Sequence, residues 1–463
     1  MMSTLFNPAN RSAQGSTGNP GYCTCKNRWD GSLSSSTDLQ TTFLRLAIAR
    51  DKCMNDDQKK TLQLLLPNAS IDKQLIVPRG KLPEELHAEI ISGDAAKLML
   101  AGQRGMGKST ELRRLCELLE DSELLPILLQ FGAQESISSA TLVRAMAEAL
   151  YAEKEAQVNE QDFKALWAWY EDQEVSDLLE EGVDSSAGVG GDLIIVKAKG
   201  EILHRHLKTI RKSRKTVKDS GELLDRFNAL VEKSRKTSGR RAVFLVDDID
   251  KIPDSSSIEG TFIHSSHLVA QIASPCVFTV PIHYATSSFL RSSDLGYVSH
   301  RVPAVEIEDG NGKRNDEGFE FMREVCARRM PFNPIPAELL DAVLKLSGGV
   351  LIDAMRLLRD ICKEAILSQD LKVDQGTVDE QFQKLVDSYT YVLDSPALWQ
   401  RLAFFAKATD KRVFKTDTLL PELLHKTIVI EYWHKALWFD LHPAARKLYL
   451  QNSDVIDARF PLE

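Results

Sequence analysis

Several features that would place this chain outside the ordinary globular proteins are missing from it. No run of about 18 or more apolar residues occurs in the sequence, so we expect no membrane-spanning helix. The first 20 residues are mostly polar and lack the charged-then-apolar layout of a secretory signal. The seven cysteines are odd in number and scattered. Scattered cysteines argue against a disulfide framework and favour a reducing, cytoplasmic setting.

The cysteines divide into two kinds by their surroundings. Those within apolar helix or strand patterns are Cys116, Cys276, Cys326 and Cys362, and we expect them to pack as free thiols. The close pair Cys23 and Cys25 could hold a metal, but no second pair of ligands accompanies it. The alternative for that pair is a plain disordered tail.

Charge is unevenly spread along the chain. The net charge is −8, yet residues 196–241 hold fifteen Lys/Arg against five Asp/Glu, a local charge of +10 that leaves −18 elsewhere. This asymmetry suggests an anionic partner such as DNA for the basic segment, and a solvated basic helix is the alternative.

The pattern of apolar residues predicts a mainly α/β chain with several parts. We expect a flexible tail over residues 1–38, a helical segment over 39–74 and a nucleotide-binding core over 75–310, interrupted by a basic helical insertion at 156–240. A helical lid at 311–390 and a winged-helix-like module at 391–463 follow. Within the core, short apolar runs at 97–101, 124–131, 242–246, 276–282 and 302–307 alternate with helical patterns. Continuous apolar strands between helices predict a parallel sheet covered on both faces.

A phosphate-binding loop is the most specific motif. The G-x-x-x-x-G-K-[ST] pattern is matched at every fixed position by Gly102, Gln103, Arg104, Gly105, Met106, Gly107, Lys108 and Ser109, with Thr110 next. An apolar strand precedes the loop and an amphipathic helix follows it, which is the context that this motif requires. The loop predicts a site for a nucleoside triphosphate, most simply ATP with Mg²⁺.

The roles of these residues follow from phosphate chemistry. Glycines let successive N–H groups turn toward phosphate oxygens, and the helix that begins at Lys108 directs its positive end at them. We expect Lys108 to reach the β- and γ-phosphates and Ser109 to offer its hydroxyl to Mg²⁺.

A second acidic motif follows the apolar run at 242–246. Asp247 and Asp248 end this strand, which we expect beside the strand of the phosphate loop, as in a Walker B motif. Asp247 is then a Mg²⁺ ligand, and Asp248 takes the place where many ATPases have a glutamate that polarises water. Because aspartate is shorter by one methylene, hydrolysis is expected to be slow. Asp250 and Lys251 extend the motif, either to cap the next helix or to sense the nucleotide.

Four residues are weaker candidates for sensing or completing the site. Thr279 within the strand at 276–282 could read the γ-phosphate, or it is simply a β-branched residue in a strand; His283 follows it. Arg291 and Arg301 lie before the last apolar run. Either could act as an arginine finger toward a neighbouring subunit, with ordinary surface arginine as the alternative.

The lid and the C-terminal block supply the remaining candidates. After the break at Ser347, a helical pattern carries Arg356 and Arg359, either of which could contact the γ-phosphate. Their alternative is ion pairing with Asp353 or Asp360. Near the C-terminus, helices and a two-stranded hairpin hold many aromatic residues but a modest basic set, which favours packing or partner binding over base reading.

The order of these motifs resembles the AAA+ ATPases, and within them the origin-recognition and transposition-regulator group together with the related STAND signalling ATPases. The resemblance covers about residues 75–450. It implies that Lys108 and Ser109 bind phosphate and Mg²⁺, that Asp247 holds Mg²⁺, that Asp248 assists hydrolysis, and that Arg356 or Arg359 is the second sensor. ATPases of this layout change shape or assemble, often on DNA or with effector proteins, and bacterial examples occur in phage-defence loci.

Three functions are therefore open. The first is an ATP-driven switch that forms homo-oligomers or engages a partner protein. The second is a DNA-binding ATPase, a loader or target selector that uses the basic segment 196–241. The third is a small-molecule kinase, which would release a phosphorylated product instead of free phosphate.

Overall fold

The computed structural model describes residues 54–66, 72–120, 123–131, 136–166, 196–198, 201–203, 220–252, 255–264, 266–286, 296–368, 371–408, 417–433 and 436–461. The chain divides into two compact units, Met1–Met54 and Asn55–Glu463, and the second holds every element discussed below. The predicted tail, Cys23, Cys25 and Arg291 lie outside the described residues, as do residues 199–200 and 204–219 of the basic segment.

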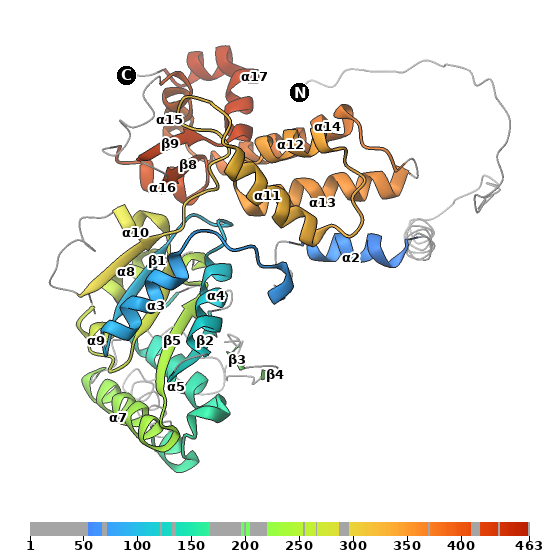
Figure 1. Ribbon diagram of the computed structural model, residues 1–463. Coiled ribbons are helices and arrows are strands. Elements are labelled where there is room, and N and C mark those ends of the chain that lie inside the picture. The colour runs from blue at the N-terminus through green and yellow to red at the C-terminus, as the bar shows by residue number, and fades with distance from the viewer. Residues whose placement is uncertain are drawn as a thin grey trace, which may run out of the picture. The chain divides into compact units, whose positions relative to one another are not determined.

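A five-stranded parallel sheet forms the centre of the core (Figure 1), as the alternating apolar runs predicted. Its strands are β1 (Lys97–Ala101), β2 (Leu124–Gln130), β5 (Arg241–Asp247), β6 (Cys276–Val280) and β7 (Tyr297–Arg301). They are ordered β2-β5-β6-β1-β7, and every neighbouring pair is parallel.

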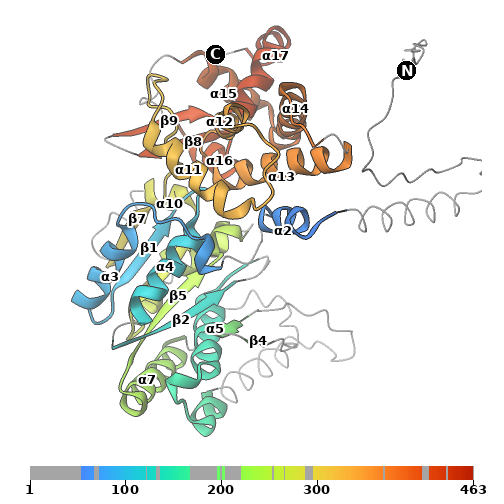
Figure 2. The ribbon, with the colours of Figure 1, turned by 45° about the vertical axis from the view of Figure 1, so that its right-hand side comes forward.

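Helices cover both faces of the sheet, so its strands are apolar on both sides. Leu98 and Leu100 of β1 lie in one apolar cluster with residues of α3 (Leu82–Ser92) and α4 (Lys108–Glu120), which pack side by side (Figure 2). Met99 of β1 points to the opposite face and joins a cluster with residues of α5 (Ser139–Ala152) and α7 (Ser220–Ser238). Successive strand residues point to opposite faces, which explains why β1 is buried at every position.

Several short elements accompany the core. The remaining helical ones are α2 (Asp56–Leu64), η1 (Lys73–Leu75), η2 (Lys154–Ala156), η3 (Ile249–Lys251), α8 (Ser255–Glu259), a π-helix (Gly260–His264), α9 (Ser266–Ala270) and α10 (Ile282–Thr286). Within the insertion, β3 (Val196–Ala198) and β4 (Glu201–Leu203) form an antiparallel pair.

Four helices follow the core, and we refer to the region that they span as the lid: α11 (Asp316–Arg329), α12 (Ala337–Leu346), α13 (Leu351–Ser368) and α14 (Gln375–Val392). The starts of α11 and α14 have a local cause, because a polar residue caps each of them. The side chain of Asn315 accepts from the N–H of Gly318, and that of Asp374 accepts from the N–H of Thr377. Such caps satisfy N–H groups that have no partner within the helix.

The C-terminal module is defined here as residues 396–459. It contains α15 (Pro396–Lys407), α16 (Leu420–His425), the antiparallel strands β8 (Val429–Trp433) and β9 (Leu437–Leu441), and α17 (Pro443–Arg459). Its aromatic residues serve mainly for packing, as expected. Tyr432 stacks on Trp438 with ring centroids 4.2 Å apart, and both are buried, whereas Trp433 is half exposed.

Two predictions about the sheet were wrong. The last strand of the sheet is β7 and not residues 302–307. The sequence did not predict β7 because it is an edge strand, and its residues Val298 and Ser299 are exposed. The apolar residues after it bond elsewhere: the N–H of Val305 donates to the carbonyl of Gly349 over 3.1 Å. The strand that ends in Asp247 is also not adjacent to β1, since β6 lies between them.

The four cysteines among the described residues are free, as expected. Cys276, Cys326 and Cys362 are buried free thiols, and Cys116 is half-buried and free. Burial raises the pKa of Cys276 to about 11, which keeps it a thiol at neutral pH. Across the described ranges, no helix is long and apolar enough to cross a membrane.

Candidate functional site

The phosphate loop joins the end of β1 to the start of α4. Gly105 and Gly107 have φ angles of +82° and +97°, a backbone region that side chains with a Cβ rarely adopt. A Cβ on Gly105 would also lie 2.1 Å from the Cγ2 of Ile352 in α13. The loop therefore requires glycine both for its own turn and for the close approach of the lid.

Lys108 has three acceptors for its three N–H groups. Its Nζ donates to the carbonyls of Gly102 over 2.7 Å and of Gln103 over 2.8 Å. It also lies 2.9 Å from Oδ2 of Asp250 in an ion pair with both side chains buried. Any further acceptor, such as a phosphate oxygen, has to displace one of these three.

Ser109 and Asp247 come together although β6 separates their strands. The Ser109 side chain lies close enough to the Asp247 carboxylate, which is buried at the end of β5, to lower the pKa of that carboxyl. Burial raises the pKa of Asp247, and the nearby carboxylates of Asp248 and Asp250 raise it further. The site thus concentrates negative charge beside a hydroxyl, a set of oxygen ligands that suits a hard divalent cation.

Asp248 and Asp250 have different surroundings. Asp248, at a left-handed φ of +72°, pairs with Lys251 over 2.5 Å. It is not among the residues that line the cavity described next, whereas Asp250 and Lys251 are. Sequence reasoning assigned the hydrolytic role to Asp248 and left Asp250 open, so the partner of Lys108 was missed.

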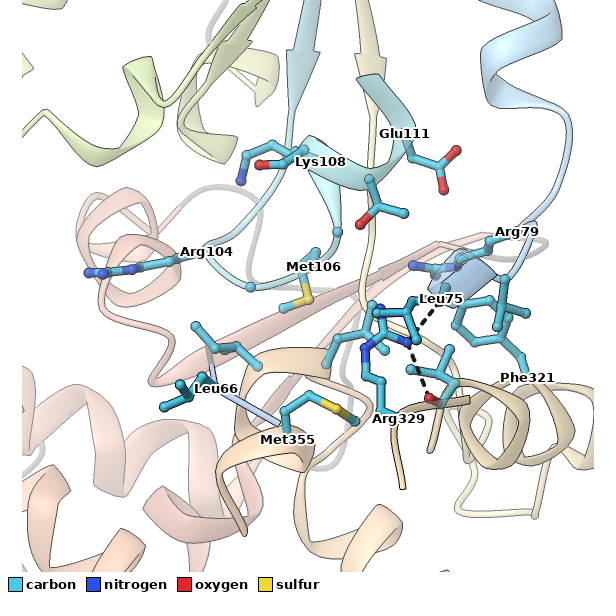
Figure 3. Close-up of a pocket in the computed structure, with 18 of the residues that line it drawn as sticks. Leu66, Leu75, Arg79, Arg104, Met106, Lys108, Glu111, Phe321, Arg329 and Met355 are labelled. Atoms are coloured by element: carbon cyan, nitrogen blue, oxygen red, sulfur yellow. Dashed lines mark hydrogen bonds between the residues drawn. The ribbon is translucent and has the colours of Figure 1, made fainter. Parts of the chain in front are cut away.

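A cavity of about 200 Å³ lies against the loop (Figure 3). The loop contributes Arg104 and the consecutive residues through Glu111, while Gly102 and Gln103 do not line the cavity. The lid contributes Phe321, Val325, Leu351, Ile352 and Met355, and the segment before α3 contributes Leu75 and Val77. One end of the cavity is therefore polar and follows the loop, and the other is apolar.

Two arginines that the sequence did not reveal line the cavity as well (Figure 3). Arg79 donates to the carbonyls of Pro303 over 2.8 Å and Ala304 over 2.6 Å, and burial lowers its pKa to about 10. Arg329, in the last turn of α11, donates to the carbonyl of Leu75 over 3.0 Å, and burial also lowers its pKa. Both hold cationic groups in a partly apolar environment, which an anionic or polar ligand would stabilise.

The two predicted sensor arginines of α13 are not brought into this cavity. Arg356 pairs with Asp353 over 3.0 Å and is about half exposed, and Arg359 lies 3.6 Å from Asp360. These are the ion pairs that stood as the alternative interpretation.

The structure also places Thr279, His283 and Arg301. Thr279 is fully buried in β6, and no partner for its hydroxyl is found among the described residues. His283 is the second residue of α10, which follows β6; burial lowers its pKa to about 4, helped by the nearby His425. Arg301 pairs with Glu431 over 2.6 Å and lies over the ring of Trp433.

Comparisons with known proteins give the chain no family. No family model matches it, and no curated protein does. It is similar to a chain in the structure of Drosophila ORC bound to DNA, with 12% identity and a TM-score of 0.41 over 95% of this chain and 97% of that one. It is also similar to the Aeropyrum pernix ORC1 protein in complex with DNA, with 16% identity and a TM-score of 0.40 over 86% and 97%. Scores and identities this low carry no functional conclusion.

Proposed function

We propose that this chain binds ATP with Mg²⁺ at the phosphate loop, hydrolyses it slowly and acts as a nucleotide-driven switch. One observation carries the proposal: Ser109, next to Lys108 at the start of α4, lines the cavity of the loop and lies close to the buried carboxylate of Asp247. In phosphate-loop NTPases, these three groups are the Mg²⁺ hydroxyl, the Mg²⁺ carboxylate and the phosphate-binding lysine.

The residues present fit a magnesium ion. A carboxylate whose pKa is raised by burial and by two neighbouring acids is stabilised when a cation comes close. Among the described residues no cluster of three or more carboxylate, imidazole or thiolate groups could hold a metal alone. Mg²⁺ commonly uses only one or two protein ligands together with phosphates and water, and Ser109 and Asp247 would supply those two.

The apolar end of the cavity fits a nucleobase. Leu75 and Val77 come from the segment before α3, and Phe321 and Met355 come from the lid. A flat aromatic base buries its faces well between such side chains. Because these walls belong to separate elements, a bound nucleotide would bring the lid and the core together at one place.

This arrangement favours a switch over a motor. Asp248, in the position of the usual glutamate, is engaged with Lys251. The lid rests on the loop, since the N–H of Ile352 donates to the carbonyl of Gly105 over 3.2 Å. Occupancy of the loop is therefore positioned to change the lid, and through it the assembly of copies of this chain or the binding of a partner protein. A role of this chain in a bacterial defence system stays a prediction.

The DNA-binding alternative has less support from the described residues. On α7, Arg226 pairs with Glu222 over 2.7 Å and Lys236 with Glu232 over 3.4 Å. At the end of the segment, Arg241 pairs with Asp94 over 2.8 Å. These ion pairs neutralise part of the charge that would otherwise meet phosphates.

The experiment is ATP binding and turnover by the purified chain, with and without duplex DNA. A variant in which Lys108→Met is combined with Asp250→Asn removes the lysine without leaving a lone buried charge. Arg356→Gln, which changes a half-exposed arginine of the lid outside the cavity, is the control. Binding that is lost in the double variant and kept in the control supports the proposal.

Three other outcomes carry separate conclusions. Equal ATP binding by the double variant would refute the site. Turnover stimulated by DNA would favour a DNA-coupled ATPase over the switch. A phosphorylated small molecule in place of free phosphate would indicate a kinase.

A further inference from the structure

Gln103 belongs to the phosphate loop, but its side chain points away from the cavity into the C-terminal module. The amide is buried, with 3% of the residue exposed. Its Nε2 donates to the carbonyls of Leu424 over 2.9 Å and Val429 over 2.8 Å, and its Oε1 accepts from the N–H of Glu431 over 2.8 Å. Both N–H groups and the oxygen of the amide are thus used to hold one short stretch of backbone.

That stretch is the junction between α16 and β8, more than 320 residues further along the chain. The main chain of Gln103 serves a different partner, because its carbonyl accepts from Nζ of Lys108 over 2.8 Å. One residue therefore contacts the lysine of the nucleotide site through its backbone and the C-terminal module through its side chain.

A second contact of the α16–β8 junction lies close to the nucleotide site. His425, the last residue of α16, lies near Asp250 and Arg104, and burial lowers its pKa. Asp250 is the carboxylate that pairs with Lys108. Two of the three groups that hold Lys108 in place, the Gln103 carbonyl and Asp250, are thus next to the α16–β8 junction.

Other contacts hold the module without involving the loop. The Tyr432 hydroxyl donates to the carbonyl of Gly348 in the lid over 2.7 Å, and Trp438 donates to Glu306 over 3.1 Å. These contacts attach the module in the same region, so they allow a matched control for Gln103.

We propose that Gln103 couples occupancy of the nucleotide site to docking of the C-terminal module, and that the coupling is negative. The inference rests on the proposed ATP site. Because the module fixes the side-chain amide of Gln103, the backbone carbonyl of Gln103 stays where it accepts from Lys108. A phosphate must therefore draw Lys108 away from this carbonyl. ATP binding consequently loosens the α16–β8 junction, and by reciprocity the docked module weakens ATP binding, by a factor that typically lies at about 5 to 150 for coupled sites.

The test compares backbone hydrogen exchange over Leu424–Glu431 with and without ATP and Mg²⁺. In the wild-type chain, ATP should speed exchange there. Gln103→Leu, of similar size, should bind ATP at least fivefold more tightly, exchange faster without ATP, and show no further increase with it. Tyr432→Phe should also raise the basal exchange, but its exchange should still respond to ATP, because its coupling residue is intact.

The outcomes separate this inference from the proposed function. ATP binding without any change in exchange over this junction refutes the coupling and leaves the ATP site standing. A Gln103→Leu chain whose exchange still responds to ATP refutes the role of Gln103 in particular. No ATP binding by the wild-type chain refutes both. If Gln103→Leu does not fold, Gln103→Asn, whose shorter amide reaches less of the junction, should show the same loss of response in part.

Discussion

The ammonium of Lys108 lies 2.9 Å from the carboxylate of Asp250, and about 5% of each side chain is exposed. The lysine that a triphosphate needs is thus held by an internal anion as well as by two carbonyls. Nucleotide binding at this loop is therefore an exchange of one anionic partner for another. The affinity for ATP depends on how strongly Asp250 competes.

Replacing Asp250 by asparagine should increase ATP affinity by fivefold or more. The change leaves a buried lysine without its counter-ion, and breaking such a pair typically costs about 3–5 kcal/mol of stability. We therefore expect a lower melting temperature without ligand and a larger rise when ATP and Mg²⁺ are added. Calorimetric titration and thermal melts measure both. Asp248→Asn is the control, since its partner Lys251 is partly exposed. Weaker ATP binding by a folded Asp250→Asn chain would show that Asp250 contacts the ligand directly.

Replacing Asp247 by asparagine should stabilise the chain while removing its use of Mg²⁺. Burial and two neighbouring carboxylates raise the pKa of Asp247, so its charge opposes folding above that pKa. The asparagine chain should gain about 0.5–2 kcal/mol, the range of typical stabilising changes. Because a raised pKa favours the folded state at low pH, the gain over wild type should shrink as the pH falls through it. Melts in EDTA at pH 7 and pH 5 test this, and ATP titrations with and without Mg²⁺ should become alike. A less stable variant at pH 7 would contradict the expectation.

The strands of the centre of the sheet could be predicted from sequence because they are buried on both faces. The runs at 97–101 and 276–282 are apolar except for Lys97 and Thr279, and β1 and β6 begin at their first residues. The edge strand β7 could not, since only one neighbour pairs with it and two of its five residues are exposed. The apolar pattern also indicates which strands are buried but not which strands are neighbours in the sheet. The position of β6 between β1 and β5 therefore could not be predicted from the sequence.

The candidate site also contains residues that the sequence predicts and residues that it does not. Lys108 and Ser109 have a fixed spacing because one loop must surround a phosphate, and spacing is visible in sequence. The partners of Gln103 are backbone groups more than 320 residues away, and Arg79 and Arg329 also donate to backbone carbonyls. A hydrogen bond to a backbone group does not require a particular side chain at the partner residue, so the sequence does not reveal it. These residues could be found only from the folded chain.

Acidic pH should destabilise the fold through His283. Burial and the neighbouring His425 lower its pKa from 6.5 to about 4. The unfolded chain therefore binds more protons between these values, and stability should be lost as the pH falls from 6.5 toward 4. For this group the loss amounts to about 3 kcal/mol. His283→Phe keeps a ring in contact with Tyr284 but cannot be protonated, so its melting temperature should fall less between pH 7 and pH 4.5. Tyr284→Phe serves as the control, and its pH dependence should match the wild type. Identical profiles for all three chains would exclude His283 as the cause.

We expect ATP binding to require Arg329 of the lid, and neither Arg356 nor Arg359 of α13. Arg329 lines the cavity and fixes Leu75, another wall residue, through a hydrogen bond to its carbonyl, whereas Arg356 is paired on the helix surface. Arg329→Met keeps the length of the side chain but removes its donors. We expect the nucleotide to accept a hydrogen bond from Arg329; loss of such a charged hydrogen bond typically costs about 1.5–3 kcal/mol, so ATP should bind at least tenfold more weakly. Arg356→Gln and Arg359→Gln should bind ATP as the wild type does. Fluorescence titration with a labelled ATP analogue, competed by unlabelled ATP, measures all four chains. Weakened binding by Arg356→Gln or Arg359→Gln, with Arg329→Met unaffected, would restore the assignment made from sequence, and it would mean that α13 turns its arginines toward the nucleotide once the lid closes on it.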